Sequence, residues 1–70
     1  MDVMEQFYFA AVNGGFVSAA VRAPTRTEAK DRLKLYGKEE AVEITAKQYA
    51  ALGPFYDRGE LPTVSDMGEA

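Results

Sequence analysis

Two apolar runs separated by Asn13-Gly14-Gly15 constrain the fold of this chain more than any other feature. The runs are FYFAAV at residues 7–12 and FVSAAV at residues 16–21. Asn and Gly tolerate positive φ, and a short turn of this kind between two such runs is a strong hairpin signal. We therefore predict a β-hairpin whose loop uses either Asn13-Gly14 as a two-residue turn or all three residues.

Side chains alternate along a strand, so each hairpin residue can be assigned to a face. One face is predicted to carry Phe7, Phe9, Ala11, Phe16, Ser18, Ala20 and Arg22. The other is predicted to carry Tyr8, Ala10, Val12, Val17, Ala19 and Val21. We expect this division to hold for either turn.

Both predicted faces are apolar, whereas an antiparallel sheet with one face in water normally alternates apolar and polar residues. The face with the three Phe residues suits the first helix. The other face needs cover from the second helix, from Phe55-Tyr56 or from a second molecule. We therefore treat its larger side chains as a candidate partner-binding surface, which consists of Tyr8, Val12, Val17 and Val21.

Two capping patterns mark the helices. Thr25-Arg26-Thr27-Glu28 reads as a capping box and predicts a helix over residues 26–36, ended by Gly37. Its apolar stripe is Ala29, Leu33 and Tyr36. Thr45-Ala46-Lys47-Gln48 repeats the pattern and predicts a second helix through Leu52 that closes at Gly53-Pro54.

Residues 41–45 (AVEIT) alternate and predict a third strand, buried on the side of Val42 and Ile44. The order β-β-α-β-α indicates an α+β fold: a small antiparallel sheet from the N-terminal hairpin and the third strand, with one helix packed on it. We expect residues 1–56 to form this single domain. Residues 57–70 hold four acids and one Arg, and predict an acidic, flexible tail in which residues 61–64 leave room for a short edge strand.

The chain has no His and no Cys, which removes the commonest catalytic side chains and nearly all zinc, haem and iron–sulfur ligands. Neither Ser18 nor Ser65 stands in a nucleophile context. The closest approach to paired carboxylates is a group of three glutamates: Glu39, Glu40 and Glu43. We expect them to be solvent-exposed around the start of the third strand and not to form a hydrolase pair or a divalent cation site. We expect a protein that is not an enzyme, with no cofactor and no metal.

Charge is uneven along the chain, whose net charge is −3. Arg26, Lys30 and Lys34 line one face of the first predicted helix and are candidates for contact with a partner or with phosphates. The sequence pI of about 4.8 argues against direct nucleic-acid binding and favours a solvated helix face. Asp57 and Glu60 in the acidic tail are further candidate contacts.

The longest mainly apolar stretch, residues 7–21, is interrupted by Asn13-Gly14-Gly15, and the start of the chain is acidic. Neither feature suits a membrane span or a secretory signal. We expect a soluble cytoplasmic protein that does not bind a membrane.

The stretch APTRTEAK at residues 23–30, followed by AVEIT at residues 41–45, resembles small phage-encoded proteins, among them some anti-CRISPR inhibitors. AVEIT followed by QYAAL at residues 48–52 is also similar to a segment of phage tail-fibre assembly proteins. The first resemblance implies a stoichiometric inhibitor that occludes a site on a host protein or nucleoprotein complex, in the host cell cytoplasm. No functional residue carries over from either pattern.

We therefore expect a non-enzymatic protein-binding module, with a homodimer as a further possibility. Two alternatives stay open. One is a phage structural or tail-assembly chaperone that acts as a homo-oligomer, and the other is a small nucleic-acid-binding protein that uses its basic first helix.

Overall fold

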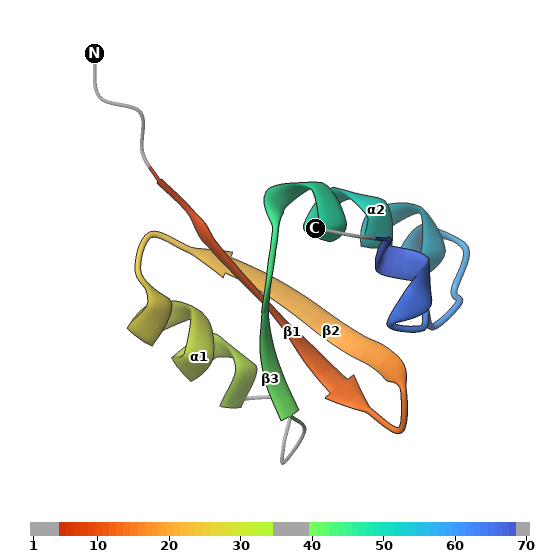
Figure 1. The fold of residues 1–70 in the computed structure, drawn as a ribbon, viewed down its shortest axis with the longest axis horizontal. Helices are drawn as coiled ribbons and strands as arrows, with labels where there is room; N and C mark the ends of the chain where they lie inside the picture. Colours follow the sequence, from red (N-terminus) through yellow and green to blue (C-terminus); the bar gives the residue numbers. More distant parts are fainter. Residues whose placement is uncertain (1–4, 35–39, 69–70) are drawn as a thin grey trace.

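The computed structural model describes residues 5–34 and 40–68, which form a three-stranded antiparallel sheet with a helix on each face (Figure 1). The strands are β1 (Phe7–Asn13), β2 (Phe16–Ala23) and β3 (Glu40–Ile44), in the order β2-β1-β3. The helices are α1 (Arg26–Lys34), α2 (Ala46–Asp57) and the short 3-10 helix η1 (Ser65–Met67). The predicted α+β class and the order β-β-α-β-α are confirmed.

The hairpin turn uses Gly14 and Gly15, between the paired residues Asn13 and Phe16. Both glycines have positive φ, +60° and +85°. A type I′ turn requires positive φ at both central residues, and its twist matches that of the flanking strands. The turn is therefore one residue later than Asn13-Gly14.

A β-bulge in β2 changes which side chains share a face. Val12 pairs with Val17, but Ala11 pairs with Ala19, so Ser18 is the extra residue. Its hydroxyl donates to the Ala11 carbonyl at 3.3 Å. An extra residue reverses the alternation beyond it, so the prediction that the faces are independent of register was wrong after Ser18.

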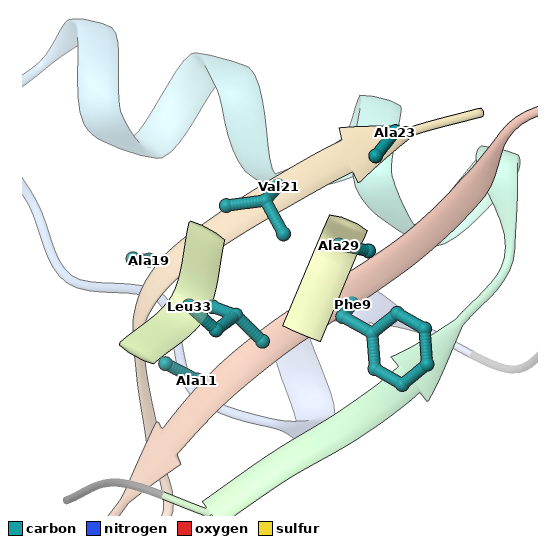
Figure 2. Close-up of a cluster of buried hydrophobic side chains, with 7 residues drawn as sticks. All are labelled: Phe9, Ala11, Ala19, Val21, Ala23, Ala29 and Leu33. Carbon is teal, nitrogen blue, oxygen red and sulfur yellow. The ribbon is translucent and has the colours of Figure 1, made fainter. Parts of the chain in front are cut away.

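The first core lies between the sheet and α1, as Figure 2 shows. Thr25 caps this helix by accepting from the Glu28 amide at 3.1 Å. As predicted, Ala29 and Leu33 are buried; Tyr36 and Gly37 lie outside the described residues. The core contains Phe9, Ala11, Ala19, Val21, Ala23, Ala29 and Leu33. Because of the bulge, Ala19 and Val21 belong to this face and not to that of Tyr8.

The second core lies on the opposite face, under α2 and η1. A complete capping box joins Thr45 and Gln48 at the start of α2, as the sequence predicts. The helix then passes through Pro54 to Asp57, so the expected end at Gly53-Pro54 was wrong. Continuing the helix places Tyr56 on the sheet, where its hydroxyl donates to the Val17 carbonyl at 2.8 Å. The buried residues of this core are Ala10, Val17, Ile44, Leu52 and Met67.

The segment after α2 is part of the folded unit. The Val17 amide donates to the Pro62 carbonyl at 2.8 Å, and the Val64 amide donates to the Gly15 carbonyl at 2.9 Å. Thr63 forms an isolated bridge with Phe16, and Pro62 and Met67 are buried. The expectation of a flexible tail from residue 57 onward therefore fails for residues 57–68: Asp57 ends α2, the backbone of residues 62–64 bonds to Gly15 and Val17, and Pro62 and Met67 are buried.

Among the described residues, no helix is long and apolar enough to cross a membrane.

Candidate functional site

The apolar hairpin face predicted to meet a partner is largely covered by the chain itself. Val17 is fully buried under the second core, and Val21 is buried under α1. Tyr8 and Val12 are half-buried and pack against the second core. The sequence left cover by the chain itself and cover by a second molecule open; the structure shows the internal cover, and the buried side chains of Val17 and Val21 are not available to a partner.

A different apolar surface remains, which we name the apolar corner: Phe16, Leu61 and Val64. Their exposed fractions are 47%, 58% and 43%, and they are the large hydrophobic side chains that stay exposed in the described part of the chain. The bridge between Phe16 and Thr63 brings the start of β2 beside this C-terminal segment. The corner thus joins two segments that are far apart in the sequence.

Local packing explains why Leu61 points outward. Pro62 is buried, while its neighbours Leu61 and Thr63 are exposed and half-exposed. In an extended segment, neighbouring side chains point to opposite sides, so burial of Pro62 turns Leu61 toward solvent. The hydrogen bonds on both sides of Thr63, at the Pro62 carbonyl and the Val64 amide, fix the segment in place. The corner is held by the sheet and does not depend on a free loop.

The surroundings of the corner are acidic. Residues 57–68 hold Asp57, Glu60 and Asp66 against Arg58. Glu60 pairs with Arg58 at 3.2 Å, and Asp66 accepts from the Thr63 amide at 2.8 Å. Of the two predicted contacts in this region, Glu60 directly precedes Leu61, whereas Asp57 is exposed at the end of α2.

The predicted basic stripe lies along α1, and each of its side chains has an intrachain neighbour. Arg26 pairs with Glu43 at 3.3 Å and stacks over the Phe7 ring at 4.6 Å from its centre. The Lys30 ammonium lies 5.8 Å from the centre of the Phe9 ring. Lys34 pairs with Asp31 at 3.4 Å. These exposed pairs contribute at most about 1 kcal/mol each, and they leave no cluster of cations directed at a common point.

A cleft of about 500 Å³ opens at the ends of β1 and β3 and reaches the first residues of α2. Three of its polar side chains are engaged within the chain: Arg26 pairs with Glu43, and Thr45 accepts from the Gln48 backbone amide at 3.1 Å. Glu5 and Gln6 also line the cleft. Within residues 5–34 and 40–68 there is no group of three or more His, Cys, Asp or Glu residues that could hold a metal. Glu40 and Glu43 are exposed on β3, and Glu39 lies outside the described residues.

A second, smaller pocket of about 130 Å³ lies between α2 and β2. It is lined by Ala20, Tyr49, Leu52, Gly53 and Tyr56. Burial raises the pKa of Tyr56 above its usual value of 10, and its hydroxyl is committed to the Val17 carbonyl. The volume is well below the roughly 300 Å³ at which small-molecule sites begin. We interpret this pocket as a packing defect beneath α2.

Sequence reasoning missed the apolar corner. The sequence places Phe16 on a covered face, and Leu61 and Val64 in a flexible tail. One signal was present: LPTV at residues 61–64 left room for a short edge strand, and this segment is the one that meets β2.

Comparison with known proteins adds no relative: no family model matches the chain, and no curated protein and no solved structure matches it.

Proposed function

We propose that this chain is a non-enzymatic protein-binding module that docks a partner through the apolar corner. The observation that carries the proposal is the position of Phe16, Leu61 and Val64, which stay exposed on a segment anchored to the sheet. Elsewhere in the described chain, the large apolar side chains are buried or half-buried. Apolar side chains clustered on an ordered surface are typical of protein-binding sites.

The charge around the corner favours a partner with a basic rim around an apolar recess. Glu60 and Asp66 lie in the segment that carries Leu61 and Val64, and residues 57–68 as a whole carry net negative charge that Arg58 partly offsets. Complementary charge at a rim raises the association rate and selects against acidic partners. Together with the resemblance to phage-encoded inhibitors, this supports a host protein or nucleoprotein complex as the partner, with a site occluded by stoichiometric binding.

Direct nucleic-acid binding is a weaker proposal for the same molecule. The segment around the apolar corner carries net negative charge, which repels phosphate, and the cations of the basic stripe on α1 have intrachain neighbours. A gel shift with single- and double-stranded DNA and RNA at low salt separates the two functions. A shift that Leu61→Ser leaves unchanged and that Lys30→Ala reduces would replace the proposed function with nucleic-acid binding.

The direct test compares capture of host proteins by the wild type and by a double variant, Phe16→Thr with Leu61→Ser. Both side chains are about half exposed, so we expect the variant to fold. Burying about 100 Å² of Leu61 surface at an interface contributes roughly 2 kcal/mol, so affinity for the captured partner should fall by tenfold or more.

Ala50→Ser, at an exposed position on α2, is the matched control and should leave the affinity unchanged. Binding of equal strength by the wild type and by the corner variant would refute docking at the corner. Purified partner should be titrated by calorimetry, because capture alone does not locate the contact.

A further inference from the structure

The outer edge of β3 is a second surface with defined chemistry. The sheet order β2-β1-β3 makes both β2 and β3 edge strands. Residues 62–64 cover one end of the β2 edge, through the hydrogen bonds at Val17 and Gly15. Among the described residues, no backbone or side-chain hydrogen bond reaches the backbone on the outer side of β3.

The backbone groups on that outer edge follow from the pairing. The Val17 amide donates to Pro62 and thus points away from β1, so Val17 and Val12 form a pair without mutual hydrogen bonds. The N–H and C=O of Val12 must then point toward β3, where Val12 pairs with Glu40. By alternation, Glu40, Val42 and Ile44 direct their backbone groups to β1, and Ala41 and Glu43 direct theirs outward.

These outward groups are symmetric about Val42. If a second β3 lies antiparallel with Val42 opposite Val42, then Ala41 of each copy faces Glu43 of the other. Each of the two Ala41 and Glu43 pairs exchanges two hydrogen bonds, so all four outward groups of each strand are satisfied. A register centred on Glu43 instead places two like charges directly opposite, which is unfavourable.

We propose that this protein forms a symmetric homodimer in which β3 pairs with β3 of a second copy, centred on Val42. The two sheets then become one sheet of six strands, and no edge is left at β3. The surface used is separate from the apolar corner, which lies along β2 at the opposite edge of the sheet.

The surroundings of β3 permit this approach. Both helices pack mainly on β1 and β2 and lie over the faces of the sheet, and within the described residues neither forms a backbone hydrogen bond with the outer edge of β3. Figure 2 shows α1 lying over β1 and β2, with β3 to one side. Val42 is only half-buried against the second core, and Val42 of the second copy completes its cover. Arg26 offsets the charge of Glu43 at 3.3 Å, which reduces the repulsion between the two copies.

The first test is solution mass against concentration by sedimentation equilibrium, up to about 1 mM, because a single strand pair makes a small interface and a weak dimer. We expect the mass to rise from 7.7 kDa toward twice that value. Ala41→Pro removes an outward N–H and no bond to β1, so it should keep the wild-type circular dichroism spectrum and stay monomeric. Leu61→Ser, at the other edge, should dimerise like the wild type.

The second test introduces a single cysteine. The chain has no cysteine of its own, so any disulfide must form at the introduced position. Across a pair without mutual hydrogen bonds the Cα atoms lie about 4.5 Å apart, which suits a disulfide. Val42→Cys should therefore form covalent dimers at least tenfold faster than the control Ala50→Cys, which is exposed on α2.

The proposal is overturned by a wild type that is monomeric to about 1 mM, or by equal cross-linking rates at Val42 and Ala50. A dimer that a folded Ala41→Pro variant leaves intact overturns it as well. Should Ala41→Pro fail to fold, the cross-linking comparison decides the matter by itself. None of these results bears on docking at the apolar corner.

Discussion

Replacing Met67 by Ala tests whether the C-terminal segment belongs to the folded unit. Met67 is 6% exposed and packs in the second core, while Leu61, six residues earlier in the same segment, is 58% exposed. Truncating a buried Met to Ala costs about 2–5 kcal/mol, through lost burial and the cavity that remains. Because Met67 is carried by a 3-10 helix of only three residues, which can shift to fill part of the cavity, we expect about 2–3 kcal/mol.

That loss is large for a chain of this size. At about 0.05–0.15 kcal/mol per residue, the total free energy of unfolding is roughly 3.5–10 kcal/mol. The melting temperature of Met67→Ala should therefore fall by about 10–20 °C, since 1 kcal/mol corresponds to about 4–8 °C in a domain this small. Leu61→Ala removes a similar volume from an exposed position and should cost less than about 1 kcal/mol.

The assay is urea unfolding followed by circular dichroism, in which the midpoint and the m-value of both variants are fitted and compared with those of the wild type. If Met67→Ala unfolds within about 0.5 kcal/mol of the wild type, residues 58–68 do not contribute to the second core and the reasoning fails. A fall in m-value as well as midpoint would show instead that the segment detaches before the rest of the chain unfolds.

Three further predictions concern single positions. Gly15→Ala should destabilise by about 1 kcal/mol because its φ is +85°. Gly53→Ala, inside α2, should change the stability by less, because the helix propensity gained is offset by crowding of the new Cβ against the ring of Pro54; equal losses for both variants in thermal melts would contradict this. Thr45→Ala removes the cap of α2 and should cost about 1 kcal/mol in urea unfolding, and an unchanged midpoint would count against the capping box. Tyr56→Phe loses the hydrogen bond to the Val17 carbonyl and should cost about 1 kcal/mol near neutral pH. Burial raises the pKa of Tyr56 in the folded state, so the neutral phenol stabilises the fold fully below about pH 10, and this stabilisation is lost as the pH rises through the folded pKa. Between about pH 8 and pH 11, the melting temperature of Tyr56→Phe should therefore fall by less than that of the wild type.

Local chemistry made much of the fold predictable. Two adjacent glycines after Asn13 admit a hairpin turn, and the capping pattern at Thr45 marks a helix start that the structure confirms. The stripe of Ala29 and Leu33 predicted which face of α1 is buried. Each of these signals depends on residues within a few positions of one another.

The errors arose where distant contacts decide the structure. A bulge at Ser18 depends on how β2 fits against β1, and the side-chain pattern alone does not reveal it. Pro54 is a helix breaker by local rules, yet the apolar spacing of Tyr49, Leu52 and Tyr56 continues through it, and packing on the sheet keeps the helix intact. Burial of Met67 likewise depends on a core built by residues far away in the sequence.

The candidate site, too, was predictable only as far as local sequence patterns determine it. Sequence reasoning identified an apolar hairpin in need of cover and weighed internal against intermolecular cover. The structure covers it internally with α2 and η1, and that packing is what leaves Leu61 and Val64 exposed beside Phe16. The apolar corner is thus a product of the same C-terminal segment that closes the second core, and no local pattern could have placed Phe16 next to Leu61.

The two proposed surfaces constrain each other through the order of the strands. Because β2 and β3 are opposite edges, pairing through β3 leaves the corner on β2 free, and it places two corners at the far ends of one six-stranded sheet. Such a dimer binds a partner with two sites more tightly than a monomer does, without any new contact, provided that the spacing of the sites matches. Ala41→Pro should then weaken binding to a two-site partner and leave binding to a one-site partner unchanged, whereas Leu61→Ser should weaken both.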